Sequence, residues 1–91
     1  MTLLVNGAYG LRQSMISACI LIRTERGRFQ DVAKKLKQIK EVRRAFPVLG
    51  RFDIVAEVEA TDNKRLGQAI LKANRMAGIV FTETLPQVEG S

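Results

Sequence analysis

The sequence predicts a small α+β domain whose strands and helices follow in the order βαββαβ. Two observations support this fold class. Short segments rich in β-branched residues alternate apolar and polar positions, as strands do, and two longer segments repeat apolar residues at helical spacing. The chain has 91 residues, 46% of them apolar and 26% charged, which is the balance of one folded domain rather than of a disordered chain.

The first strand is expected at Ile16–Arg23. Its residues are apolar on both sides of the strand, which predicts a central position in the sheet. Residues 1–14 carry one charged side chain, Arg12, and are interpreted as a leader or as sequence upstream of the real start. A short additional strand at residues 3–5 is left open.

A helix is expected over Arg28–Lys40. Five apolar residues recur there at helical spacing and would form one buried stripe. Four lysines occupy the other side toward the C-terminal end, where the helix dipole favours cations. The stripe consists of Phe29, Val32, Ala33, Leu36 and Ile39.

The next two strands are expected to form a hairpin. The second strand covers Glu41–Leu49, and because Pro47 lacks an amide donor, this strand is expected at an edge of the sheet or at a bulge. Gly50 and Arg51 form the turn, and the alternating segment Asp53–Glu59 forms the third strand.

Thr61–Asn63 supplies capping side chains for a second helix, and Gly78 is placed to end it. The fourth strand covers Ile79–Leu85 and ends at Pro86. The domain is expected to span residues 15–89, with a tail at 90–91.

The order βαββαβ is the ferredoxin-like arrangement, which places both helices on one face of an antiparallel sheet. The stripe of the second helix consists of Leu66, Ala69, Ile70, Ala73, Met76 and Ala77.

The other face of the sheet retains apolar side chains that the helices would not cover, including Cys19, Leu21, Val55 and Val80. An exposed apolar face of this size is unusual in a monomer. The sequence therefore predicts a dimeric α/β-barrel-type packing, in which two sheets face each other, or strand pairing across a two-fold axis.

The residue types that are absent exclude several classes of protein. The chain has no His, which excludes a His-based triad and a His-liganded metal site. One Cys cannot form an intramolecular disulfide, and no signal peptide or membrane span is visible, so a cytoplasmic protein without a membrane partner is expected. The net charge of +6 is consistent with a nucleic-acid partner or with an ordinary basic surface.

Few side chains are candidates for chemistry. Glu57 and Glu59 lie two residues apart, hence on one face of a strand, and form either an acid–base pair or two solvated carboxylates. Cys19 lies in an apolar run and is interpreted as a structural thiol. Arg26 and Arg28 either bind an anion at the helix start or form a solvated turn. We assign no catalytic residue, cofactor or metal.

The turn between the second and third strands is the strongest binding candidate. Gly50 lets another backbone approach closely, and the Asp53 carboxylate can accept hydrogen bonds from an ammonium group. Thr82 and Thr84 share one face of the last strand. Together these groups suit a zwitterion such as an amino acid, although an ordinary turn and two ordinary strand threonines explain them equally well.

Several segments resemble the effector-binding domain of the Lrp/AsnC, or feast/famine, transcription regulators, also called the RAM domain. The resemblance covers residues 15–89, and the Gly-x-Phe-Asp turn with the late Thr-x-Thr strand is its most specific part. The matching segments are Ala18–Ile22, Gly27, Val32–Leu36, Val48–Val55 and Gly78–Leu85.

The resemblance implies dimers that pair through their sheets and assemble into octamers, with a small effector between dimers. Asp53 would accept the ammonium group of an amino acid, and amides near Gly50 would bind its carboxylate. About fourteen residues precede the domain, too few for a helix-turn-helix, so the chain is similar to stand-alone members. The implied ligand-binding residues are Gly50, Arg51, Phe52, Asp53, Asn63, Thr82, Thr84, Leu85 and Pro86.

The sequence thus predicts a homo-oligomeric, non-enzymatic module that senses an amino acid. It could also join full-length Lrp/AsnC-type regulators in mixed oligomers, and no direct sequence-specific DNA binding is expected. The alternatives are a small dimeric α+β-barrel enzyme of the monooxygenase or isomerase kind, which needs a polar cavity between sheet and helices, and a basic nucleic-acid-binding module, whose binding would depend steeply on salt.

Overall fold

The computed structural model describes residues 15–87, which form four strands and two helices in the predicted order. The ferredoxin-like α+β fold is confirmed. The proposed leader at residues 1–14, with its open question of a strand at 3–5, and the tail at 90–91 lie outside the described residues. The elements are β1 (Ile16–Thr24), α1 (Phe29–Leu36), β2 (Val42–Pro47), β3 (Ile54–Ala60), α2 (Asn63–Asn74) and β4 (Ile79–Pro86).

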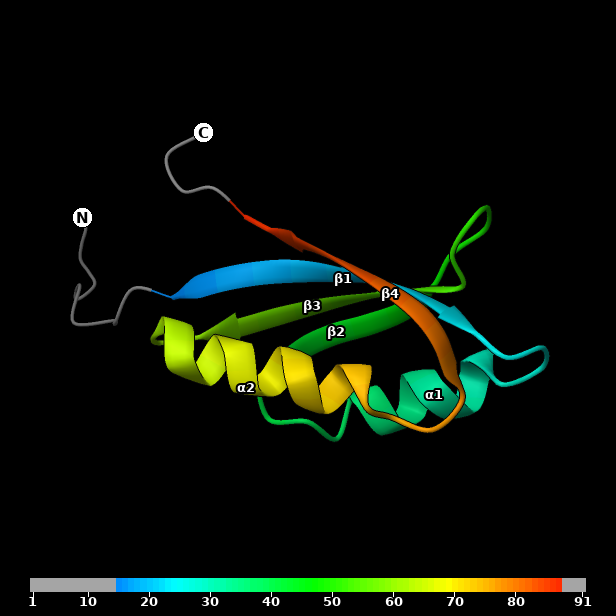
Figure 1. Ribbon diagram of the computed structural model, residues 1–91, viewed down its shortest axis with the longest axis horizontal. Coiled ribbons are helices and arrows are strands. Elements are labelled where there is room, and N and C mark those ends of the chain that lie inside the picture. The colour runs from blue at the N-terminus through cyan, green and yellow to red at the C-terminus, as the bar shows by residue number, and fades with distance from the viewer. Residues whose placement is uncertain (1–14, 88–91) are drawn as a thin grey trace.

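The four strands form one antiparallel sheet with the order β2-β3-β1-β4, and both helices lie on the same side of it (Figure 1). The apolar first strand is therefore central, as predicted, and β2 and β4 are the edges. Within residues 15–87, neither helix is long and apolar enough to cross a lipid bilayer.

The core lies between the sheet and the helices. Ile20 and Ala56 are paired across β1 and β3, and both are completely buried on the helix side. Val32 and Leu36 of α1 pack against this layer and are also completely buried. The alternation along the strands and the helical spacing in α1 thus direct their apolar side chains into one shared core.

The first helix is shorter than predicted, because it ends at Leu36 rather than at Lys40. The amides of Gln38 and Ile39 donate to carbonyls three residues back, at 3.1 and 3.0 Å, so the chain continues in tighter turns. Ile39 remains buried. The apolar periodicity therefore continued past the helix end and concealed it.

The second helix begins as predicted. A carboxylate oxygen of Asp62 accepts a hydrogen bond from the amide of Arg65 at 2.8 Å, which caps the first turn. The helix ends at Asn74, four residues before Gly78. Of the two predicted stripe residues beyond this end, Met76 packs against the core and Ala77 is exposed.

Pro47 is the last residue of edge strand β2, as its missing amide predicts.

Gly78 is needed where the chain turns from α2 into β4. Its φ is +95°, and an added Cβ would lie 2.9 Å from Cγ2 of Val32. Gly78→Ala is therefore expected to lower the free energy of unfolding by about 1–3 kcal/mol, measured by urea denaturation.

Gly67→Ala is the matched control for this prediction. Gly67 lies inside α2, and no atom lies within 4 Å of a Cβ built there. The same substitution should stabilise the domain by about 0.5–1 kcal/mol, because alanine favours the helix. Equal effects of the two substitutions would show that the turn at Gly78 imposes no strain.

Candidate functional site

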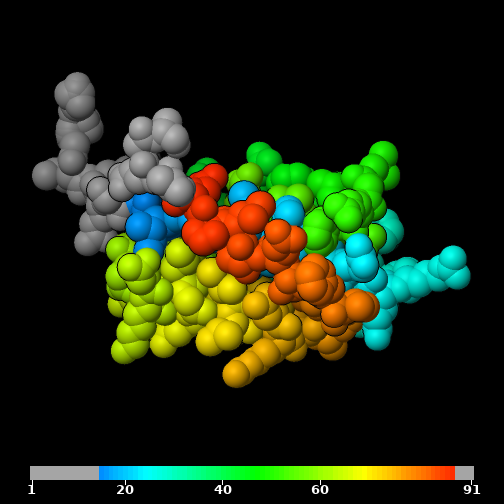
Figure 2. Space-filling model, turned by 45° about the horizontal axis from the view of Figure 1, so that its top comes forward, coloured from blue at the N-terminus to red at the C-terminus, as the bar shows by residue number. Residues whose placement is uncertain are grey.

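One face of the sheet carries no helix and exposes apolar side chains. We call it the open face. Cys19 and Leu21 of β1 are half-buried there, and Phe81 and Leu85 of β4 are about half exposed, at 52% and 45%. Figure 2 shows β4, orange to red, at the surface between α2 in yellow and the β2–β3 hairpin in green. The prediction that the helices cover one face only is confirmed.

The carboxylates considered for acid–base work lie on the open face, and each is paired with an arginine of β2. Glu59 lies 2.8 Å from the Arg43 guanidinium, and Glu57 lies 3.4 Å from that of Arg44. Both arginines are more than half exposed, so these ion pairs contribute little to stability. The two carboxylates act as partners of arginines rather than of each other.

The turn after β2 is held at both ends. The amide of Val48 donates to the carbonyl of Asp53 at 2.9 Å, and Gly50 between them has a φ of +120°. The Arg23 guanidinium donates to the carbonyl of Arg51 at 2.9 and 3.2 Å, which ties the turn to β1. A side chain at Gly50 would be strained at this φ, so glycine suits the position.

Phe52 directs this turn toward the open face. Its ring stacks on Phe81 of β4 with centroids 6.3 Å apart, and the Arg23 guanidinium lies 5.9 Å from the Phe52 ring centroid. The turn therefore contacts both β1 and β4, and its position is fixed by side chains as well as by backbone bonds.

Asp53 makes the most specific contact of the turn. Its Oδ2 accepts hydrogen bonds from the amide of Thr24 at 2.8 Å and from the Thr24 hydroxyl at 3.3 Å. Thr24 is buried at the end of β1. An ionised carboxylate accepts about four hydrogen bonds, so Asp53 fixes the strand end and retains capacity for a further donor.

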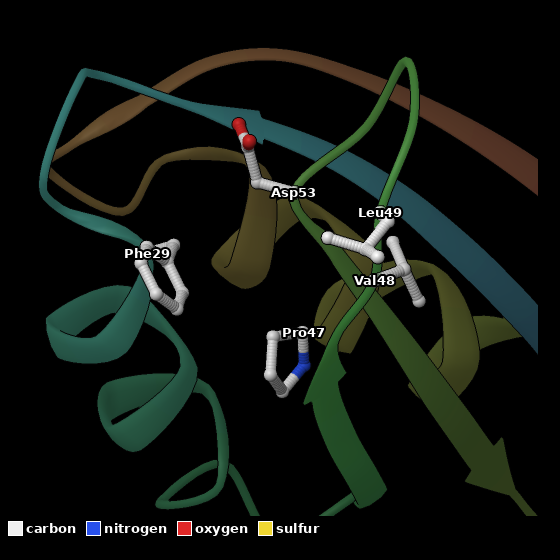
Figure 3. A pocket seen from close by; sticks show the side chains of 5 residues that line it. All are labelled: Phe29, Pro47, Val48, Leu49 and Asp53. Atoms are coloured by element: carbon white, nitrogen blue, oxygen red, sulfur yellow. The ribbon is translucent and has the colours of Figure 1, made fainter.

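A pocket of about 510 Å³ opens beside Asp53, within the size range of sites for small molecules. Figure 3 shows Phe29, at the start of α1, facing Pro47 across it, with the Asp53 carboxylate directed toward β1. The remaining lining residues are Val48 and Leu49. One carboxylate at the margin of apolar walls suits a small ligand with a cationic group and an apolar part.

The sequence prediction missed the role of Phe29, which was assigned to the core stripe. Phe29 is 36% exposed and lines the pocket instead. It is the first residue of the stripe and lies almost one turn before Val32, the first buried one. The ends of an amphipathic stripe reach the margin of the core. The position of Phe29 at the start of the stripe was therefore the signal in the sequence that its side chain could be exposed.

The remaining predicted site residues lie along β4 and at the start of α2. Thr82 and Thr84 pair with Ile22 and Ile20, so both threonines share the helix side of the sheet and are half-buried. Thr82 is therefore near the Asp53 end of the sheet, because the amide of Asp53 donates to the carbonyl of Ile22 at 2.8 Å.

Asn63, Leu85 and Pro86 lie toward the other end of the sheet. Pro86 pairs with Ala18, four residues along β1 from Ile22, which is about 13 Å in a strand. Asn63 begins α2 and lies three residues after Ala60, the last residue of β3. Ala60 pairs with Ile16, the first residue of β1, so Asn63 follows the end of the sheet that is far from Ile22. Within one chain, Thr82 lies at the same end of the sheet as Asp53, with β1 between them, whereas Asn63, Leu85 and Pro86 lie toward the other end.

The space between the sheet and the helices, where the alternative enzyme would need a polar cavity, is occupied by packed apolar side chains in the described part of the chain. Nor do residues 15–87 bring together three or more Cys, Asp or Glu that could hold a metal ion. The pocket beside Asp53 is thus the candidate ligand site.

Comparison with known proteins gives the fold and the family. The hypothetical protein PHS023 from Pyrococcus horikoshii is 34% identical with a TM-score of 0.75, over 80% of this chain and 89% of that chain. FFRP-DM1 is 34% identical with a TM-score of 0.76, over 80% and 99% of the two chains. A search of curated proteins found no match.

A more distant structure is that of the transcriptional regulator NMB0573 from Neisseria meningitidis in complex with L-Met. It is 17% identical with a TM-score of 0.72, and the match covers 99% of this chain and 58% of the regulator. The family model described as the Lrp/AsnC ligand binding domain matches residues 17–89, which include every strand and helix of the fold except the first residue of β1. The chain belongs to the Lrp/AsnC ligand binding domain family.

Proposed function

We propose that this domain senses an amino acid and couples its binding to self-assembly, without catalysing a reaction, in the cytoplasm. The observation that carries the proposal is the pocket in which one carboxylate, Asp53, borders the apolar residues Phe29, Pro47 and Leu49. The family supports it, because its members are ligand-binding domains related to transcription regulators. The L-Met complex of the Neisseria regulator supports an amino acid as the class of ligand.

Each part of an amino acid has a suitable partner at this pocket. The Asp53 carboxylate would accept hydrogen bonds from the ammonium group with its unused oxygen, Oδ1. The amides of residues 49–52 donate no hydrogen bond to another group within residues 15–87, and they would bind the carboxylate. The side chain would contact Phe29 and Pro47, so the ligand we propose is an apolar amino acid.

A second chain would complete the site. Asn63, Leu85 and Pro86 are too far from Asp53 within one chain, so we propose that they contribute, with Thr82 and Thr84, from a neighbouring dimer. In the same proposal, Arg51 and Phe52 position the turn. A ligand held between dimers stabilises the assembly that binds it and so shifts the oligomeric equilibrium.

The open face would form the dimer. Its apolar residues Leu21, Phe81 and Leu85 are arranged over two adjacent strands, where a second sheet can bury them. We propose that such dimers assemble further, up to an octamer, and that the same surfaces allow mixed assemblies with full-length Lrp/AsnC-type regulators. Sequence-specific binding to DNA would then come only from these partner regulators.

Light scattering after size-exclusion chromatography, with and without each of the twenty amino acids, tests the proposal. We expect an oligomer whose mass changes with an apolar amino acid. An assembly of fixed mass that binds none of the twenty by calorimetry would contradict effector sensing.

Asp53→Asn is expected to weaken amino-acid binding about 10- to 100-fold, because an uncharged amide replaces the partner of the ammonium group. The asparagine oxygen can still accept from Thr24, so the fold should persist. Asp62→Asn is the matched control, since Asp62 also accepts a backbone amide but lies outside the pocket. If calorimetry gave the two variants equal affinities for the amino acid, Asp53 would not be a ligand-binding residue.

A further inference from the structure

The net positive charge of this protein comes from one continuous segment. Residues 26–44 contain eight Lys or Arg and two Asp or Glu, which gives +6. The rest of the chain contains seven of each kind and is neutral in sum. The segment comprises α1, the turns on either side of it and the first half of β2, so the charge is concentrated on one flank of the domain.

Two adjoining hollows follow the seam between α1 and β2 on this flank. We call them together the α1–β2 groove. They have volumes of about 330 and 460 Å³, and Lys37 lines both. No Asp or Glu lines either hollow. The first is lined by Phe29, Gln30, Ala33, Lys34, Lys37 and Pro47, and the second by Lys37, Arg43, Arg44, Ala45 and Phe46.

Asp31, the acidic residue of α1, is already engaged by two cations that line neither hollow. Asp31 accepts from Arg28 at 3.2 Å and lies 3.4 Å from Lys35, and these contacts, that of Arg28 first, lower the pKa of its carboxyl group. Asp31 is therefore ionised at neutral pH and neutralises cations outside the groove. The carboxylates that pair with the β2 arginines belong to β3 and line neither hollow.

The lysines of the groove carry the charge that is left over. Lys34, Lys37 and the neighbouring Lys40 are exposed, and the described residues provide no ion pair for them. Arg43 and Arg44 each have one carboxylate partner, and a guanidinium has five N–H donors, so both retain donors for another acceptor.

Apolar and aromatic surface borders these cations at both ends of the groove. The Arg44 guanidinium lies 4.7 Å from the centroid of the half-buried Phe46 ring, and Phe29 is 36% exposed at the other end of the groove. Cations along a groove that also exposes aromatic rings are the combination that binds phosphates and stacks bases of a single strand. A duplex hides its bases from such rings.

We propose that the α1–β2 groove binds single-stranded nucleic acid without sequence preference. Lys34, Lys37 and the two β2 arginines contact phosphates, and Phe46 stacks on a base. This binding requires no effector, although the groove shares Phe29 and Pro47 with the pocket beside Asp53. It is also distinct from sequence-specific recognition, because phosphate contacts carry no base information.

Fluorescence anisotropy of the full chain with a labelled oligothymidylate of about twenty nucleotides tests the proposal. We expect binding at low salt that weakens steeply as salt rises, and weaker binding to a duplex of the same length. Absence of binding at low salt, or a preference for the duplex, would overturn it.

The double variant Lys34→Gln/Lys37→Gln distinguishes the groove from general charge attraction. It should reduce affinity at least about tenfold and flatten the logarithmic salt dependence by about 0.7 for each lost phosphate contact. Lys64→Gln/Lys72→Gln removes the same charge from exposed positions of α2 and should have little effect. Equal losses in the two double variants would refute a defined site.

Phe46→Leu tests the stacking contact with little change in volume. Binding should weaken about fivefold or more while the salt dependence stays the same, since no phosphate contact is removed. An unchanged affinity would contradict the single-strand assignment. Circular dichroism of each variant establishes that the fold is intact.

Discussion

Replacing Leu36 with alanine is expected to lower the free energy of unfolding by about 2–5 kcal/mol. Leu36 is the last residue of α1 and is completely buried against the sheet. The substitution removes apolar contacts and leaves a cavity that the packed core cannot fill by relaxation alone. Natural domains are stable by about 5–15 kcal/mol, so a domain this small could lose most of its stability.

Leu71→Ala provides the matched control for this prediction. Leu71 also lies on a helix, but it is 55% exposed. Its substitution should change the stability by no more than about 0.5 kcal/mol. Urea denaturation of both variants measures the difference, and comparable losses would mean that α1 does not pack on the sheet as described.

Introducing a charge at the centre of the open face should have the second large effect, on assembly. Leu21 lies in the central strand, between Val55 of β3 and Glu83 of β4. In the proposed dimer, Leu21→Glu would bury a carboxylate without a partner, close to Glu83. We expect the dimer dissociation constant to rise at least about 100-fold, so that light scattering at micromolar concentration reports monomers.

The same substitution on the helix side is the control. Leu71→Glu adds an identical charge to exposed α2, away from the open face, and should leave the assembled mass unchanged. Retention of the dimer by Leu21→Glu would show that the open face is not the dimer interface. Dissociation by both variants would indicate that added negative charge alone controls the mass.

The fold could be predicted from the sequence because its periodicities are regular. Alternation along β3 places Ile54, Ala56 and Val58 in the core, and the pattern alone assigns them. The end of α1 could not be predicted, because Ile39 remains on the buried side through tighter turns. A buried stripe indicates where side chains point and leaves open which hydrogen bonds the backbone makes.

The candidate site could be predicted from the sequence only in part. The Gly-x-Phe-Asp turn made Asp53 a candidate, because a carboxylate at the start of a strand can accept hydrogen bonds from an ammonium group. Its bond to Thr24 and its position beside Phe29 depend on tertiary packing between segments about 24 to 29 residues apart, which no local pattern encodes. The groove lysines were visible as a charged helix face, but the hollows between α1 and β2 were not.

The two edge strands of the sheet differ in how they are protected. Each strand has a bulge and a terminal proline, which interrupt the row of backbone donors and acceptors, but only β2 also carries exposed arginines, Arg43 and Arg44. These features discourage uncontrolled growth of the sheet by another strand. On β4, Val80 and Phe81 are exposed and Glu83 is the single charged residue. Aggregation of partly unfolded chains should therefore start at β4, and a lysine at Val80 should slow it.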